Sequence, residues 1–196
     1  AQGIIVNARG ERYCNESAYG AQIGFHMCEK NEGVGWIVMD AASFARARRQ
    51  AMPWRVLLFQ SVLSLMTMYF NSRKSDTIEG LARECGFDPR VFRETVDAYN
   101  RACSGAEPDP FRKAPEYHAD ITQGPFYALN ISKDSKTFPL AVISFGGLAV
   151  EERTSQVLRE DGSPVPGLYA AGRVAAGLPS NHYMSGFAIA DCIFTG

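Results

Sequence analysis

The chain has 196 residues, of which 46% are hydrophobic and 21% are charged, a composition typical of one folded domain or two small ones. Its 20 basic and 21 acidic residues leave a net charge of -1, which argues against a nucleic-acid partner and against a polybasic membrane anchor. Five widely spaced cysteines and three isolated histidines predict neither a disulfide framework nor a metal site, and they fit a cytoplasmic location.

The first 70 residues carry alternating strand and helix signals. Residues 4–16 predict a hairpin, and residues 36–39 predict a second short strand. Residues 41–51 are compatible with a basic helix. The uncharged run 56–70 is rich in Leu and Met and predicts a helix that is buried on most of its faces or lies at an interface. Its 15 residues fall short of the about 20 that cross a bilayer, so no membrane span is predicted.

Two helices with clear end signals follow. Over residues 76–86, Asp76 is the expected cap and Gly86 the expected stop. Asp88 then caps a second helix that has Pro89 in its first turn. These signals predict a pair of consecutive helices.

The second half of the chain is richer in strand signals. A loop with many Pro and charged residues spans 105–125, and it predicts a domain boundary. Strands are expected after it, over residues 126–131, 140–145 and 148–150. Residues 156–171 predict a hairpin, and 186–194 the first turns of a helix. The predicted fold class is α+β, with one domain over 1–125 and a more β-rich portion over 126–196.

Glycines in the last 50 residues are the strongest chemical signal. Gly146-Gly147 permits close approach to a backbone, and the strand that ends at Ala171-Gly172 exposes backbone N–H groups. Gly186 opens a helix with no side chain over its N-terminus, which is a favourable place for an anion. Together these features suit the edge of a planar, partly anionic ring. They fit equally well an ordinary glycine-rich connection in an α/β protein.

Three segments resemble the fumarate reductase/succinate dehydrogenase flavoprotein superfamily. The string DGSPVPGLYAAG resembles its flavin-proximal segment, and GIIVNARGERYCNES resembles the lead into its substrate-capping domain. LARECGFDPRVFRETVDAYNRAC resembles the paired helices of that capping domain. The resemblance implies an FAD-dependent oxidoreductase whose dinucleotide-binding half lies upstream. Residues 1–125 would then be the capping domain, and 126–196 a truncated C-terminal part of the FAD-binding domain.

The loop HYMSG resembles the Tyr-x-Ser-Gly of ketosteroid dehydrogenases, above all the 3-ketosteroid Δ4 type. Val142 and Ile143 stand where fumarate reductases carry a histidine pair, and Tyr183 stands near the place of their arginine. A clamp for a dicarboxylate needs cationic partners, so these departures favour a steroid-like ketone as substrate. Arg173 departs as well, because the family often has a flavin-side acid there.

The resemblance also implies roles for individual residues. Tyr183 would polarise the substrate carbonyl or act as base, and Ser185 would relay a proton. Tyr19 is the candidate for a second catalytic tyrosine, with Tyr13 as its competitor. Contacts with FAD are expected from Gly146, Gly147, Ala171, Gly172, Arg173, Gly186, Phe187, Ala188 and Ile189.

Two alternatives stay open at this point. A fumarate reductase-like enzyme acting on a small enoate or dicarboxylate would need its clamp from arginines such as Arg48, Arg49 or Arg55. A non-catalytic structural domain is the other alternative, because the chain lacks a pyrophosphate-binding fingerprint. We therefore predict that the chain alone is colourless and retains no FAD. Uncovered apolar faces and open sheet edges predict self-association.

Overall fold

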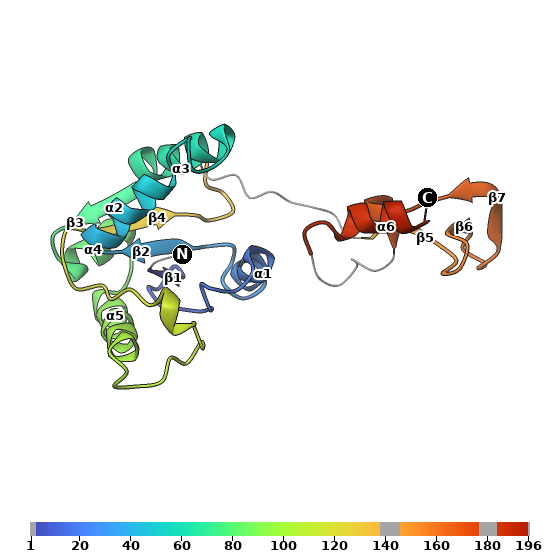
Figure 1. The fold of residues 1–196 in the computed structure, drawn as a ribbon. Helices are drawn as coiled ribbons and strands as arrows, with labels where there is room; N and C mark the ends of the chain where they lie inside the picture. Colours follow the sequence, from blue (N-terminus) through green and yellow to red (C-terminus); the bar gives the residue numbers. More distant parts are fainter. Residues whose placement is uncertain (1–2, 138–145, 177–183, 196) are drawn as a thin grey trace. The chain divides into compact units, whose positions relative to one another are not determined.

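The computed structural model describes residues 3–137, 146–176 and 184–195 and divides the chain into two compact units. The first unit is Ala1–Leu140 and the second is Ala141–Gly196 (Figure 1). Helices and small sheets occur in both units, and this mixture is consistent with the predicted α+β class.

The first unit is built on a four-stranded antiparallel sheet in the order β1-β2-β4-β3. Its strands are β1 (Ile4–Val6), β2 (Trp36–Met39), β3 (Ser72–Ser75) and β4 (Phe126–Asn130). The predicted hairpin over 4–16 forms only in part: β1 pairs with β2, and a single bridge joins Val6 to Arg12.

The division between the units falls later than the predicted boundary at residue 125. β4 lies between β2 and β3 and pairs with both, with Ile37 opposite Leu129 and Arg73 opposite Ala128. Residues 126–130 therefore belong to the first sheet. The loop 105–125 has the composition of a linker, but it returns the chain to the centre of the same unit.

Helices cover both faces of this sheet, because successive side chains of a strand point to opposite faces. On one face, Ile4, Val6 and Val38 pack in one core cluster with Phe92 and Tyr99. That face is covered by α4 (Ile78–Cys85) and α5 (Pro89–Cys103). The opposite face is covered by α1 (Gly20–Lys30), α2 (Ala41–Gln50) and α3 (Leu58–Phe70).

The ends of the helices largely follow their sequence signals. Gly86 ends α4 in the left-handed conformation, and Asp88 caps α5, as predicted. The cap of α4 is Thr77, whose Oγ1 accepts from the Gly80 N–H at 3.0 Å, so the predicted cap at Asp76 is wrong by one residue. In the first unit, the α-helix α1 and the strand β3 are additional to those predicted. The N-terminus of α1 has no side-chain cap hydrogen bond, which left the sequence without a start signal.

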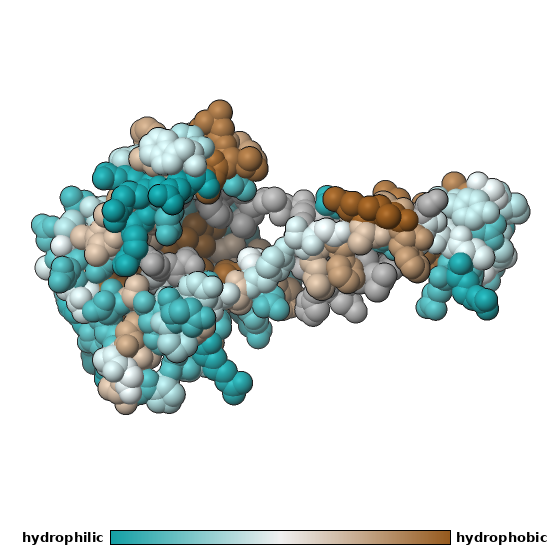
Figure 2. Space-filling view, viewed as in Figure 1, coloured by the Kyte–Doolittle hydropathy of each residue, from teal (hydrophilic) through white to brown (hydrophobic). Residues whose placement is uncertain are grey.

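Helix α3 turns its largest apolar side chains outward. Its buried residues are Ser61, Thr67 and Met68, whereas Leu58 is 69% exposed and Phe70 is 78% exposed. Burial on most faces is therefore wrong for the described structure, and the alternative of an interface helix stays a prediction. Figure 2 shows the resulting hydrophobic patch over α3. Within the described residues, no helix has the length and apolar character needed to cross a membrane.

The second unit contains two short sheets and one α-helix within its described residues. β5 (Leu148–Ala149) pairs in parallel with β8 (Ala175–Ala176), and β6 (Gln156–Leu158) pairs antiparallel with β7 (Pro164–Tyr169). The predicted hairpin over 156–171 is confirmed by the second pair. α6 (Phe187–Thr195) confirms the predicted C-terminal helix. The strand expected over 140–145 lies outside the described residues.

Candidate active site

Gly172 joins the short 3-10 turn Gly172–Val174 to helix α6. Its φ is +68°, and a Cβ there would overlap Cys192 Sγ and lie 2.9 Å from the Ala188 carbonyl oxygen. Its N–H donates to Asp191 Oδ2 at 2.6 Å. Asp191 was not among the predicted site residues, since the sequence around it reads as plain helix. The turn and the helix are thus locked together by a hydrogen bond and by the missing side chain.

We expect Gly172→Ala to destabilise the second unit by about 2–4 kcal/mol, because it adds left-handed strain to an overlap with α6. Gly162→Ala is the matched control: its φ is +81°, but no atom in the described part of the chain lies within 4 Å of its Cβ. It should cost only about 1–2 kcal/mol. Urea unfolding followed by far-UV circular dichroism measures both, and equal losses would contradict the proposed packing.

The other predicted glycines divide into closed and open positions. A Cβ at Gly147 would overlap the Val174 carbonyl, so this glycine lets two segments of its own unit approach each other. Gly146 and Gly186 have φ of +101° and +90°, and none of the described atoms lies within 4 Å of a Cβ at either position. Their backbones are therefore open to an incoming group.

The N-terminus of α6 is exposed and carries no charged side chain in its first turn. The Phe187 N–H donates to the Met184 carbonyl at 3.1 Å, and the Ala190 N–H donates to the Gly186 carbonyl at 2.9 Å. Met184, Ser185 and Gly186 are all exposed. This open turn fits the uncharged or partly negative edge of a flavin ring, since the helix N-terminus carries partial positive charge. α6 is the one α-helix among the described residues of this unit, which leaves no second helix start there for a pyrophosphate.

The predicted catalytic residues lie in different units. Tyr183 lies outside the described residues, and Ser185 sits in the exposed turn before α6. Arg173 is exposed beside Gly172 in the 3-10 turn. Tyr19 lies in the first unit, 47% exposed, where it immediately precedes α1.

Tyr13, the competitor of Tyr19, is half-buried. It packs against the cluster formed by Ile5, Cys14 and Ile131. Its hydroxyl is buried and has no hydrogen-bond partner among the described atoms, and burial raises the pKa of this phenol. The Tyr13 hydroxyl is thus less accessible than the side chain of Tyr19, and the choice between the two tyrosines stays a prediction.

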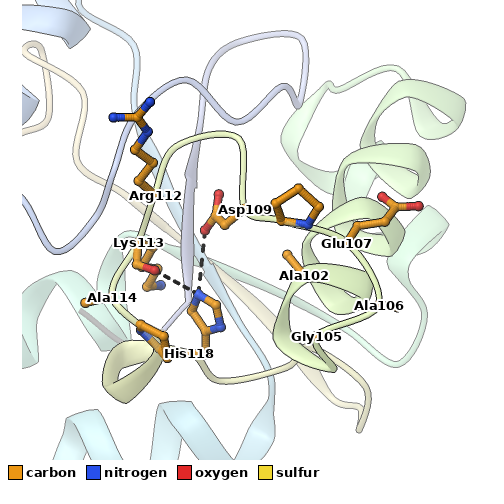
Figure 3. Close-up of a pocket in the computed structure, with 11 residues that line it drawn as sticks. Ala102, Gly105, Ala106, Glu107, Asp109, Arg112, Lys113, Ala114 and His118 are labelled. Atoms are coloured by element: carbon orange, nitrogen blue, oxygen red, sulfur yellow. Dashed lines mark hydrogen bonds and ion pairs between the residues drawn. The ribbon is translucent and has the colours of Figure 1, made fainter.

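The loop after α5 borders an open hollow of about 590 Å³ (Figure 3). Asp109 and His118 are the polar side chains in it that resemble a catalytic pair. His118 Nε2 lies 3.1 Å from the Lys113 carbonyl oxygen and 3.7 Å from Asp109 Oδ2. Both carboxylate oxygens of Asp109 accept hydrogen bonds from Arg12. These contacts hold the loop in its conformation. Since both side chains already have partners, we do not assign this hollow as an active site.

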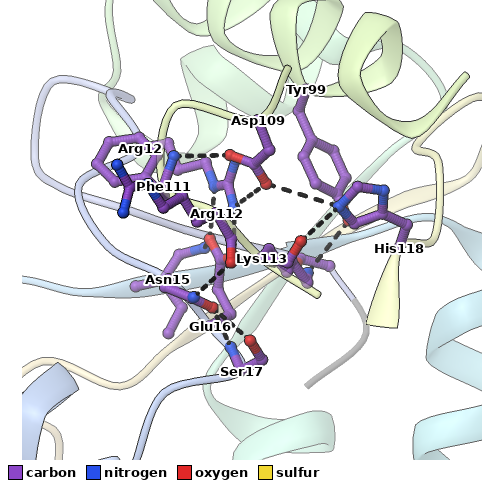
Figure 4. A network of polar contacts seen from close by, with 12 residues as sticks. Arg12, Asn15, Glu16, Ser17, Tyr99, Asp109, Phe111, Arg112, Lys113 and His118 are labelled. Atoms are coloured by element: carbon purple, nitrogen blue, oxygen red, sulfur yellow. Dashed lines mark hydrogen bonds and ion pairs between the residues drawn. The ribbon is translucent and has the colours of Figure 1, made fainter. Parts of the chain in front are cut away.

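Arg12 is the centre of a buried ion-pair network (Figure 4). Its guanidinium donates to both carboxylate oxygens of Glu16 at 2.8 Å and to those of Asp109 at 2.7 and 2.9 Å. The side chains of these three residues are at most 5% exposed. The guanidinium also lies 5.0 Å from the ring centres of Tyr99 and Phe111. Such paired forks are the strongest charge-assisted hydrogen bonds in proteins.

Lys113 completes this network from the same loop. Its Nζ donates to the Gly3 carbonyl at 2.5 Å and to Tyr99 Oη at 3.1 Å, and it lies 3.5 Å from Glu16 Oε2. Burial lowers the pKa of Lys113, and the nearby Glu16 opposes that change. Glu16 also accepts from the Ile5 N–H at 3.0 Å. The network therefore ties the start of the chain to the loop 105–125 and serves the fold of the first unit.

Comparison with known proteins gives a consistent set of relatives. A family model described as FAD binding domain matches residues 2–187. A 3-oxo-5-alpha-steroid 4-dehydrogenase of Comamonas testosteroni is 38% identical over 176 residues, which cover 87% of this chain and 32% of that protein. An NADH:fumarate oxidoreductase of Klebsiella pneumoniae is 28% identical over 193 residues, which cover 98% of this chain and 19% of that protein.

Solved structures agree with these relatives. A 3-ketosteroid-delta4-(5alpha)-dehydrogenase from Rhodococcus jostii, in complex with 4-androstene-3,17-dione, matches 99% of this chain and 37% of its own length, with a TM-score of 0.79 and 27% identity. A flavocytochrome c3 fumarate reductase matches 99% of this chain and 31% of its own, with a TM-score of 0.61 and 25% identity. These matches confirm the resemblance seen in the sequence. The chain spans about a third or less of the length of the two curated relatives described above.

Proposed function

Because this chain belongs to the family of FAD-binding domains, we propose that it is part of a flavin-dependent dehydrogenase acting beside the carbonyl of a steroid-like ketone. The 38% identity to a steroid 4-dehydrogenase over 87% of the chain carries this proposal. In it, the first unit is the substrate-capping domain, and the second unit is a C-terminal part of the FAD-binding domain.

The second unit would hold the flavin end of the cofactor. The open backbone at Gly186 and the N-terminus of α6 would face the pyrimidine edge of the ring, where the helix dipole stabilises negative charge. Gly146 offers a second open backbone position, and Arg173 an exposed cation. FAD, when bound, supplies the hydride acceptor for dehydrogenation.

The tyrosine and serine of the HYMSG loop would handle the substrate. A phenol with an ordinary pKa near 10 is protonated at neutral pH, so Tyr183 would donate a hydrogen bond to the substrate carbonyl. That bond makes the neighbouring C–H more acidic. Ser185, two residues further on in the exposed turn, would carry the released proton toward solvent. In the first unit, Tyr19 is the candidate residue for accepting the same proton.

A small enoate or dicarboxylate is the second candidate substrate. The match to a fumarate oxidoreductase over 98% of the chain favours it. A carboxylate clamp would then fall to cations such as Arg48, Arg49 and Arg55, all of which are exposed. We prefer a steroid-like ketone as substrate because the chain is 38% identical to the steroid dehydrogenase and 28% identical to the fumarate oxidoreductase.

A dye-coupled assay separates these substrates. The flavin-loaded polypeptide that contains this chain is mixed with an artificial electron acceptor and either a saturated 3-ketosteroid or succinate, and fumarate reduction is measured with a reduced dye. We expect turnover of the ketosteroid alone. Turnover confined to succinate or fumarate would establish the second candidate instead. The 196-residue chain by itself should show no flavin absorbance. A yellow preparation would contradict the proposal that the contacts with the FAD pyrophosphate come from outside these 196 residues.

A further inference from the structure

Positive charge is concentrated in one segment of a chain that is almost neutral overall. Residues 41–75 contain six basic side chains and no Asp or Glu, against a net charge of -1 for the whole chain. All six are exposed, and within the described residues none of them forms an ion pair. They are Arg46, Arg48, Arg49, Arg55, Arg73 and Lys74.

The same segment exposes a continuous apolar surface. At 100° per residue, the exposed apolar positions of α3 fall within one arc of the helix, while Ser61 and Thr67 occupy the other side. Thr67 Oγ1 is held inside, 3.0 Å from the carbonyl oxygens of Leu63 and Thr137. This hydroxyl fixes the rotation of the helix with its apolar arc outward. The arc comprises Leu58, Phe59, Val62, Met66, Tyr69 and Phe70, and Trp54 precedes it at 76% exposure.

Charge and apolar surface adjoin each other. α2 and α3 border one cavity of about 480 Å³, to which α2 contributes Ala47 and Gln50 and α3 contributes Gln60 and Ser64. The arginines of α2 therefore stand beside the helix that carries the apolar arc. Figure 2 shows the hydrophobic patch over α3 with hydrophilic side chains near it. Arg73 pairs with Ala128, whose side chain lies in the core under α4 and α5, so it points to the other face of the sheet. We call the combined surface formed by the other five cations, Trp54 and the apolar arc the α2–α3 face.

We propose that the α2–α3 face docks on an anionic lipid surface. Apolar side chains with Trp and Tyr enter the boundary between headgroups and acyl chains, and surrounding arginines pair with anionic headgroups. A second copy of the chain matches the apolar arc but sets five cations against five cations, so charge complementarity favours the lipid. Docking of this kind is peripheral, in keeping with the absence of a spanning helix among the described residues. It is independent of the proposed enzymatic function, because it needs neither flavin nor substrate.

Binding to vesicles tests the proposal with the chain as it stands. Vesicles of phosphatidylcholine mixed with phosphatidylglycerol should sediment the chain, and vesicles of phosphatidylcholine alone should do so much less. Arg48→Gln with Arg49→Gln should weaken binding about 30-fold, at about fivefold per cation. Phe59→Ser should weaken it on both lipids. In a Trp36→Phe background, Trp54 emission should shift to the blue when anionic vesicles are added.

Matched changes elsewhere provide the control. Arg83→Gln with Arg90→Gln removes two exposed cations from α4 and α5, on the other face of the sheet, and should leave vesicle binding within twofold of the parent. Circular dichroism verifies that each variant is folded. The proposal is overturned by absence of binding, or by binding indifferent to lipid charge and to Arg48 and Arg49. It is also overturned if the chain does not bind vesicles but forms a dimer, and if Phe59→Ser converts that dimer to monomers.

Discussion

Replacing Arg12 by Met should lower the free energy of unfolding of the first unit by about 3–5 kcal/mol. The change leaves the carboxylates of Glu16 and Asp109 buried without the guanidinium that now binds all four of their oxygens. Trp36, which packs against Phe87 in the core, reports the transition by fluorescence in urea. Arg12→Lys keeps the charge but loses the bidentate hydrogen bonds of the guanidinium. Its free energy of unfolding should therefore lie between those of the parent and of Arg12→Met.

An exposed arginine provides the comparison. Arg93 lies 2.6 Å from Glu79 in an equally short ion pair, but both side chains are about 40% exposed. Arg93→Met should therefore cost less than about 1 kcal/mol. Similar losses at Arg12 and Arg93 would show that burial does not decide the strength of the Arg12 network.

Acid should weaken the same network. Burial raises the pKa of Asp109, but hydrogen bonds from Arg12 and from the Phe111 N–H outweigh it, so the folded pKa lies below the ordinary 3.8. A carboxyl with a lowered folded pKa adds stability above its unfolded pKa, and that stability is lost as the pH falls through the folded value. The parent should lose stability below pH 3.8, and Arg12→Met should show a shallower loss over that range.

Tyr183→Phe should reduce ketosteroid turnover by about 10²–10⁴-fold in the flavin-loaded polypeptide that contains this chain. The change removes the hydroxyl assigned to polarise the substrate carbonyl and keeps the ring. The flavin spectrum should be unchanged, because the proposed cofactor contacts come from backbone groups near Gly186. Stopped-flow reduction of the flavin by substrate measures the chemical step directly.

The other two tyrosines complete this experiment. Tyr19→Phe should slow the same step if Tyr19 handles the proton. Tyr13→Phe should leave turnover unaltered and should not destabilise the first unit, because the lost hydroxyl is buried without a partner among the described atoms. Full turnover in Tyr183→Phe would remove the tyrosine from the mechanism, and a loss in Tyr13→Phe alone would transfer the role to Tyr13.

Local signals predicted much of the fold. Gly86 and Asp88 end one helix and start the next because their effects act within a few residues of the chain. The resemblance of the glycine-rich C-terminal segment likewise led to the FAD-binding family, which the comparisons confirm. A mistake of one residue at Thr77 is of the size expected when two potential caps are adjacent.

Features that depend on distant residues could not be predicted. Arg12 and Asp109 are 97 residues apart, and nothing in either neighbourhood signals the other. The rotation of α3 is likewise set by Thr67 contacting Thr137, not by the composition of the helix, which suggested burial. Asp191 escaped notice for a similar reason, since its partner is a backbone N–H of Gly172.

The separation between Arg12 and Asp109 has a consequence for synthesis on the ribosome. At about 5–20 residues per second, Arg12 leaves the peptidyl transferase centre about 5–20 s before Asp109 is added. Through that interval, β1 and the acidic side chain of Glu16 have no completed loop to close over them. This segment of the nascent polypeptide must therefore stay hydrated until translation reaches the residues that cover it.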